Sequence, residues 1–196
     1  MWDIAKRTDT VKLLGHQARV TCLSYDMAGS TTLLTGSEDT RVKYWDVRSG
    51  KAINTFKEHS GKVNSVQFSP DSRWAASGAD DGSLKIWELS SGKVLFNVAF
   101  PQQAVTCIQY NPLSLALANG STDRTVKYWD LEKFESISAT TQDSSAITHL
   151  AFDPDRSPDI LFAASGENIK LWNIENNKLL DQLSIIPKQI SDLKVA

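Results

Sequence analysis

The residues best suited to chemistry in this sequence form two sets of four that repeat with the same offsets. In each set a histidine lies near the start, a hydroxyl residue precedes a glycine, and an aspartate stands six residues before a tryptophan. The members are His16, Thr35, Asp39 and Trp45, followed by His59, Ser77, Asp81 and Trp87. A hydroxyl, an imidazole and a carboxylate are the groups of a hydrolytic triad, so nucleophilic catalysis is the first hypothesis to weigh.

A structural role accounts for these two sets better than catalysis does. A catalytic nucleophile must be exposed beside an oxyanion pocket, and a triad occurs once in a chain rather than at a regular interval. The indole N–H can only donate, a hydroxyl can accept from it, and a histidine can connect that hydroxyl to the turn aspartate. We therefore predict a buried hydrogen-bonded network in each repeat and no catalytic residue.

Two further repeats keep only parts of this set. The third retains Asp123 and Trp129, and Asn119 replaces the hydroxyl residue. The fourth retains Trp172, and Asp143 occupies the position of the histidine. Because an incomplete polar network stabilises less unless other groups complete it, we expect the third and fourth repeats to be less rigid.

Other candidate sites have simpler explanations. Cys22, Ser65, Cys107 and His149 occupy equivalent positions in successive repeats, whereas zinc ligands normally come in closely spaced pairs. A shared packing position is therefore predicted, with no disulfide, metal or cofactor. A lysine stands two residues before each of four tryptophans, and we expect its stem to cover apolar surface while its ammonium reaches water. A basic ladder for an acidic partner is the alternative. These lysines are Lys43, Lys85, Lys127 and Lys170.

The tryptophans themselves define the frame that must position these residues. Trp2, Trp45, Trp87, Trp129 and Trp172 are 42 or 43 residues apart. Aligned on them, the chain divides into repeats at about 12–56, 57–99, 100–140 and 141–184. Short runs of alternating hydrophobicity, separated by Gly, Asp, Ser and Pro, predict an all-β fold without long helices.

A period of this length that ends in Trp-Asp resembles the WD40 β-propeller family, in which each repeat forms one four-stranded blade. The resemblance implies a binding platform. Residues 1–3 resemble the end of a preceding blade's third strand, and residues 189–193 resemble the first strand of a further blade. We therefore expect four full repeats with partial blades at both ends, forming an arc of a larger propeller. A fragment and a natural truncation both fit this pattern.

Composition argues against several classes of partner. The chain has 196 residues, 41% of them hydrophobic, and a formal net charge of −2. Nucleic-acid binding normally needs a concentrated basic surface, and no apolar run approaches the length of a membrane span. With two cysteines and no recognisable signal peptide, we expect a cytoplasmic protein that binds neither nucleic acid nor membrane.

The third repeat resembles a narrower family, the WD40-bearing regulatory subunits of the microtubule-severing complex katanin. Residues 122–135 carry the resemblance, and the run W-D-L-E-K-F at 129–134 is its least common part. Residues 11–196 also align in order with the later blades of those subunits. The resemblance implies a non-catalytic targeting scaffold in the cytoplasm or cytoskeleton, at microtubules, the centrosome, the spindle or the ciliary axoneme. It also implies contact with a AAA ATPase severing subunit, through a helical region absent from this sequence.

Two alternatives of different class stand beside that interpretation. One is a general WD40 adaptor in a centriolar, ciliary or ubiquitin-ligase complex. The other is an enzyme built on a propeller, which would need convergent acids or metal ligands at the mouth of the central channel, and the sequence offers none.

A partner-binding rim follows from the repeat frame. Side chains just before each first strand, and just before each turn aspartate, should point to one face, where loops on a rigid scaffold usually carry recognition. A solvated surface of mixed charge is the alternative. The predicted rim residues are Gln17, Arg19, Glu38, Ser60, Lys62, Asp80, Gln102, Ala104 and Thr122.

Overall fold

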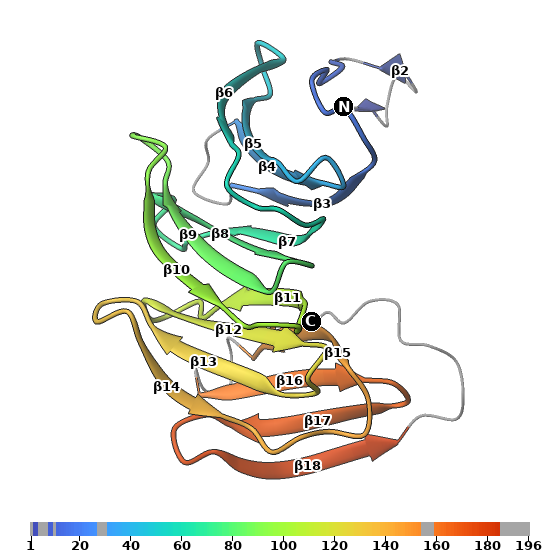
Figure 1. Cartoon of the computed structure of the whole chain (residues 1–196), viewed down its shortest axis with the longest axis vertical. Helices are drawn as coiled ribbons and strands as arrows, with labels where there is room; N and C mark the ends of the chain where they lie inside the picture. Colours follow the sequence, from blue (N-terminus) through green and yellow to red (C-terminus); the bar gives the residue numbers. More distant parts are fainter. Residues whose placement is uncertain (1, 4–7, 10, 27–30, 154–158, 185–196) are drawn as a thin grey trace.

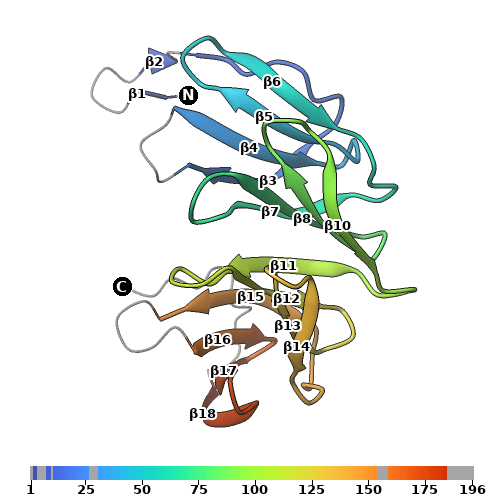
Figure 2. The same ribbon diagram turned by 90° about the vertical axis from the view of Figure 1, so that its left-hand side faces the viewer.

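Four antiparallel sheets of four strands each follow one another in chain order along an arc (Figure 1). The computed structural model describes residues 2–3, 8–9, 11–26, 31–153 and 159–184. We call the sheets blades 1 to 4. A view turned by 90° shows the same succession from the side (Figure 2). The predicted all-β architecture of four-stranded blades is confirmed.

Each blade is built from consecutive strands. Blade 1 contains β3 (Val20–Tyr25), β4 (Thr32–Ser37), β5 (Val42–Asp46) and β6 (Lys51–Phe56). Blade 2 contains β7 (Val63–Phe68), β8 (Trp74–Ala79), β9 (Ser83–Glu88) and β10 (Val94–Ala99). Blade 3 contains β11 (Val105–Tyr110), β12 (Ala116–Ser121), β13 (Val126–Asp130) and β14 (Glu135–Ala139). Blade 4 contains β15 (Ile147–Phe152), β16 (Ile160–Ser165), β17 (Asn168–Asn173) and β18 (Lys178–Ser184).

A small sheet precedes blade 1. Here β1 (Trp2–Asp3) pairs antiparallel with β2 (Thr8–Asp9), in agreement with a partial blade at this end. The strand predicted at residues 189–193 lies outside the described residues. Within the described part of the chain, no helix is long and apolar enough to span a membrane.

The turn between the second and third strands explains why aspartate recurs there. In blade 2 the Asp81 carboxylate accepts the backbone N–H of Ser83 at 2.9 Å, and the intervening Gly82 has a φ of +77°. Asp39 and Asp123 accept the N–H two residues ahead in the same way, at 3.0 and 2.9 Å. Such turns favour Asp because its short side chain satisfies the backbone locally. They fix the position of the next strand.

The hydrophobic core lies between blades. Its three clusters each combine side chains from two neighbouring blades. In the first cluster Leu34 and Val42 of blade 1 pack with Val63 and Phe68 of blade 2. The first strand of each blade is its inner strand, and β3, β7, β11 and β15 lie beside one another in that order. The blades are therefore held in a fixed arc, which brings their inner ends to a common mouth.

Candidate functional site

The predicted network in blade 1 forms a continuous chain of hydrogen bonds. Trp45 Nε1 donates to Thr35 Oγ1 at 2.8 Å, and the same hydroxyl lies 2.7 Å from His16 Nε2. His16 Nδ1 lies 2.8 Å from the Asp39 carboxylate. The chain is satisfied when Nδ1–H donates to Asp39 and Thr35 donates to Nε2. The network ties the turn, the second strand and the third strand to the segment that precedes β3.

Blade 2 repeats the network with one added residue. Trp87 Nε1 donates to Ser77 Oγ at 2.7 Å, and His59 Nε2 lies 2.7 Å from that hydroxyl. The other ring nitrogen lies 2.7 Å from Ser83 Oγ and 3.4 Å from Asp81, so Ser83 bridges the two. His59 and Asp81 therefore lie within reach of each other, as the repeat pattern predicts, and Ser83 adds a shorter bridged connection between them.

Burial sets the protonation of this second network. Burial of the His59 imidazole lowers its pKa to about 4, so the ring is neutral at neutral pH. Burial opposes ionisation of Asp81, but hydrogen bonds from Ser83 and from the Ser60 backbone outweigh it and hold its pKa at about 2. Asp81 thus stays charged as an acceptor while the histidine stays uncharged.

Blades 3 and 4 each contain an ion pair between the lysine of the third strand and an aspartate. In blade 3 Trp129 Nε1 donates to Asn119 Oδ1 at 2.7 Å, and Lys127 forms an ion pair with Asp123. In blade 4 Lys170 Nζ lies 3.0 Å from the Asp143 carboxylate. Sequence reasoning missed these pairs. The constant spacing of two residues between the lysine and the tryptophan could have indicated that the lysine is an internal hydrogen-bond donor in every blade. The lower rigidity expected of these blades stays a prediction.

The expectation that these lysines reach water is wrong. Lys43 and Lys85 are buried, and their ammonium groups donate to Thr55 Oγ1 and Asn97 Oδ1 on the outermost strand, both at 3.0 Å. With Lys127 and Lys170 in ion pairs, all four lysines are internal donors. A hydrogen bond inside the blade satisfies the ammonium where solvent does not reach.

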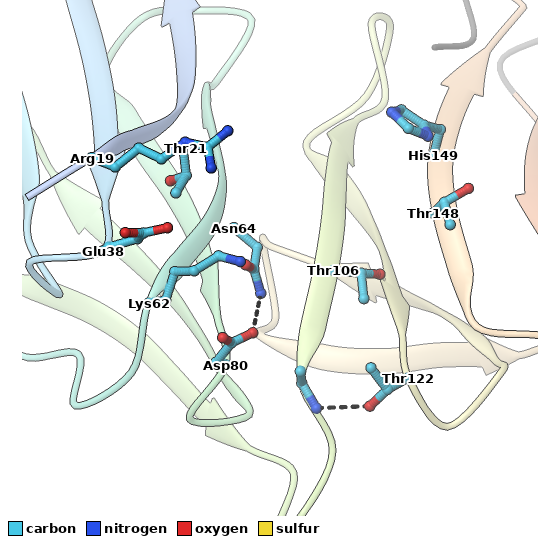
Figure 3. Close-up of a pocket in the computed structure, with 11 residues that line it drawn as sticks. Arg19, Thr21, Glu38, Lys62, Asn64, Asp80, Thr106, Thr122, Thr148 and His149 are labelled. Atoms are coloured by element: carbon cyan, nitrogen blue, oxygen red, sulfur yellow. Dashed lines mark hydrogen bonds between the residues drawn. The ribbon is translucent and has the colours of Figure 1, made fainter. Parts of the chain in front are cut away.

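A cavity of about 520 Å³ opens where the inner ends of the blades meet (Figure 3). Six of the nine predicted rim residues line this cavity. They are Arg19, Glu38, Lys62, Asp80, Ala104 and Thr122. The remaining lining residues come from the inner strands, and sequence reasoning missed them. They are Thr21, Asn64, Thr106, Thr148 and His149.

Three predicted rim residues lie outside the cavity, and their backbones belong to turns. The N–H of Gln17 donates to Asp39 at 2.9 Å, and the N–H of Ser60 donates to Asp81 at 2.7 Å. Gln102 has a φ of +63° in the turn that leads to β11. Each of them shapes the connection into an inner strand.

Charge is unevenly distributed around the cavity. Blades 1 and 2 contribute Arg19, Glu38, Lys62 and Asp80, whereas blades 3 and 4 contribute mainly threonine hydroxyls. Asp80 accepts from the Asn64 amide at 2.7 Å. Among the described residues, no carboxylate lies within ion-pair distance of Arg19 or Lys62. Both cations are therefore available to a partner.

The cysteines and the other titratable groups do not assemble a metal site in the described part of the chain. No group of three or more His, Cys, Asp or Glu side chains is close enough together there to hold an ion. Cys22 and Cys107 are both unpaired. Burial raises the pKa of the Cys107 thiol to about 11, so it is an unreactive core group.

Comparison with known proteins identifies the repeat. A family model described as "WD domain, G-beta repeat" matches residues 7–46, 50–88 and 93–130. Periodic tryptophan protein 2 of Arabidopsis thaliana is 38% identical over 72 residues, 37% of this chain and 8% of that protein. A p21-activated protein kinase-interacting protein 1-like of Xenopus laevis is 34% identical over 77 residues, 39% of this chain and 21% of that protein.

A third relative is the guanine nucleotide-binding protein subunit beta of Oryza sativa subsp. japonica. It is 40% identical over 60 residues, 30% of this chain and 16% of that protein. The matched stretch thus covers less than a quarter of the length of each relative.

Proposed function

Because the chain belongs to the WD40 repeat family, we propose that it is a non-catalytic scaffold that binds other proteins at the mouth of its central channel. The observation that carries this proposal is the cavity of about 520 Å³ to which all four blades contribute side chains. Two of the relatives have names that state an association: one interacts with a protein kinase and one is a subunit.

The charges at the mouth indicate how a partner would be held. A segment that crosses the cavity meets two cations and two carboxylates from blades 1 and 2 on one side, and threonine hydroxyls on the other. Charged groups around an interface mainly raise the association rate and select the partner, whereas shape and burial supply affinity. This layout favours a partner segment that carries charged side chains of both signs over blades 1 and 2.

The buried networks support a role without catalysis. The hydroxyls of Thr35 and Ser77 are buried, and each already binds a tryptophan and contacts a histidine. A nucleophile needs access to substrate, which these hydroxyls do not have. Hydrolytic turnover that disappears in a folded Ser77→Ala variant would contradict this part of the proposal.

Charge reversal at the mouth tests the binding site. The Arg19→Glu/Lys62→Glu variant should retain its protein partners at least tenfold less well in a pull-down from cell extract. Its thermal unfolding midpoint should be unchanged, because neither cation makes an ion pair in the described part of the chain.

The matched control reverses two exposed lysines at the other end of the blades, as Lys51→Glu/Lys93→Glu. Both variants change the net charge equally, so a general electrostatic effect would weaken both. Equal retention of partners by the two variants would move the binding site away from the mouth.

A narrower role in a microtubule-associated complex of the katanin type, in the cytoplasm and cytoskeleton, is supported by the sequence resemblance of residues 122–135. Phe134 from that stretch packs against Phe96 and Trp74, with ring centroids 5.3 and 6.1 Å away, so packing accounts for part of the resemblance. None of the relatives named above carries katanin in its name. A general WD40 adaptor is the alternative.

The choice between these partners can be made by capture. With a net charge of −2, the chain has no general attraction to an acidic surface such as that of tubulin, so we expect contact through other proteins. Neither nucleic acid nor membrane is an expected partner. Mouth-dependent recovery of tubulin-associated proteins or a AAA ATPase from cytoskeletal extract would support the katanin-type role. Recovery of a ubiquitin-ligase core instead would favour the general adaptor.

A further inference from the structure

A second cavity lies at the opposite end of the blades from the mouth. It is a groove of about 880 Å³ to which blades 1, 2 and 3 all contribute side chains. The turn between β7 and β8 belongs to this groove, whereas the residues at the start of β7 belong to the mouth. The two cavities share no lining residue, so the groove is a separate surface.

The groove contains the one tryptophan of the sequence that falls outside the regular spacing. Trp74 begins β8 and pairs with Glu88 across the strands. The strand positions paired in the same way in the other blades hold Thr32, Ala116 and Ile160. A large aromatic side chain is therefore not a requirement of the blade at this position.

Phe134 is a second departure from the repeat, and it packs against the first. It occupies a left-handed turn position, with a φ of +55°, that Gly50, Gly92 and Asn177 hold in the other blades. A bulky residue at positive φ is strained, and such strain gathers at functional positions. The strained turn places the Phe134 ring 6.1 Å from that of Trp74, centroid to centroid. Phe134 thus supports Trp74 at the edge of the groove.

The groove presents aromatic rings with free polar groups and an apolar flank on either side. Trp74 and Tyr44 are half-buried, and neither the indole N–H nor the phenol has a hydrogen-bond partner among the described residues. Ile53 of blade 1 is 53% exposed, and Leu115 of blade 3 is half-buried. Tryptophan and tyrosine are the residue types that dominate the binding energy of protein interfaces.

One carboxylate of the groove has no opposing charge. Glu88 lies directly across from Trp74, so the two side chains share a face of the sheet. Its Oε2 accepts from Ser91 at 2.6 Å, and no cation of the described residues lies within ion-pair distance of it. The Asp71 carboxylate, by contrast, lies 3.8 Å from Arg73 Nε. A carboxylate beside an indole suits a guanidinium, which stacks on aromatic rings and donates to carboxylates.

We propose that this groove docks a protein segment that inserts an arginine side chain beside Trp74 and Glu88. Apolar residues two positions before and after the arginine would contact Ile53 and Leu115, because alternate side chains of an extended segment face the same way. The groove is a second binding surface, independent of what the mouth binds.

A short peptide with this pattern is the probe. In an NMR titration of the full chain, an acetylated Leu-Ser-Arg-Ser-Leu amide should shift the indole Nε1–H signal of Trp74 saturably. The signals of Trp45 and Trp87, which are buried, should not move. The same peptide with lysine should bind at least threefold more weakly, and with glutamate it should not bind. No saturable shift at Trp74 would overturn the proposal, and equal binding by the lysine or glutamate peptide would overturn the choice of arginine.

Variants of the chain, compared by calorimetric titration with the arginine peptide, supply the second test. Glu88→Gln should weaken binding at least tenfold, because it removes the charge of the acceptor. Glu58→Gln, which changes an exposed carboxylate outside both cavities, is the matched control and should have no effect. Trp74→Phe, which preserves a ring beside Phe134, should also weaken binding. Unchanged affinity in Glu88→Gln would overturn the proposal.

The mouth variant separates this proposal from the one about the mouth. Arg19→Glu/Lys62→Glu should bind the arginine peptide as the unaltered chain does, because neither residue lines the groove. A loss of peptide binding in this variant would place the peptide at the mouth and overturn the assignment to the groove.

Discussion

Blades 1 and 2 join the same four kinds of side chain in two different ways. In blade 1 the imidazole contacts the Asp39 carboxylate directly at 2.8 Å. In blade 2 the hydroxyl of Ser83 lies between His59 and Asp81. The residue two positions after the aspartate decides the difference, since it is Arg41 in blade 1 and a small hydroxyl residue in blade 2. One neighbouring side chain therefore changes how a buried histidine is paired.

Removal of one buried hydroxyl should show how much the blade 2 network contributes to the free energy of unfolding. Ser77→Ala leaves both Trp87 Nε1 and His59 Nε2 without their partner in a fully buried position. An unpaired buried polar group costs roughly 1–3 kcal/mol, so the free energy of unfolding should fall by at least that amount. Urea titration of both proteins measures it. Ser91→Ala, which removes an exposed turn hydroxyl, is the control and should change stability little.

His59 should make the fold sensitive to acid. Its pKa is about 4 in the folded chain against an ordinary value of 6.5, so the unfolded chain binds the proton first as the pH falls. Stability should therefore decline as the pH falls from 6.5 to 4, by about 3 kcal/mol if this group acts alone. The pKa of Asp81, lowered to about 2 from 3.8, extends the decline below that range.

The measurement is the urea midpoint as a function of pH. His59→Gln should flatten the slope between pH 6.5 and 4 while leaving the decline below pH 4 in place. An unaltered slope in this variant would show that His59 does not remain neutral in the folded chain.

At the scale of elements, the third strand carries a lysine that each blade uses as an internal donor. Lys43 and Lys85 bind the outermost strand, whereas Lys127 and Lys170 each bind an aspartate of their own blade. The strand keeps one position for a cation, and its partner changes from blade to blade. Blade 3, which lacks the histidine, thereby still holds its turn aspartate, whereas in blade 4 the aspartate bound by the lysine occupies the position of the histidine.

A double-mutant cycle tests whether the ion pair of Lys127 with Asp123 stabilises blade 3. Lys127→Met and Asp123→Asn should each destabilise the chain, and the double variant should lose less than the sum. For groups in contact, the coupling energy is expected to be about 0.5–3 kcal/mol. The matched cycle uses Lys133 and Asp130, an exposed pair with a 4.0 Å separation, and should give about 1 kcal/mol or less. Equal couplings would mean that the buried pair contributes no more than a surface pair.

The strands themselves were accessible from the sequence, because period-two alternation and turn residues act locally. The predicted short runs of alternating hydrophobicity agree with the strands of five to seven residues that build the four blades. The partners of Lys127 and Lys170 were not accessible, because the direction of a long side chain depends on the packing around it. The close approach of Gly36, Gly78 and Gly120 to the next blade was not accessible either, since it depends on the register between blades and not on any single repeat.

At the scale of the whole molecule, the cavity at the inner ends of the blades is a property of the arc. Arg19 and Lys62 belong to different blades, and only the fixed order of blades places them around one cavity. The repeat frame was enough to predict them, since equivalent positions in a radial array must face the same way. Gln17 and Ser60 were predicted by the same logic, but their backbones cap turn aspartates outside the cavity.

The position of the apolar clusters has a consequence for how the molecule comes apart. Three clusters join four blades, so blades 2 and 3 are each held on both sides and blades 1 and 4 on one side by the described residues. The stability of the molecule is then approximately the sum of the stabilities of the single blades and of the three interfaces between neighbours. Blades 1 and 4 should therefore unfold locally more often than blades 2 and 3. A substitution in blade 2 or 3 that disturbs the contacts with both neighbouring blades should therefore destabilise the molecule more than an equivalent substitution in blade 1 or 4, which disturbs the contacts with one neighbour.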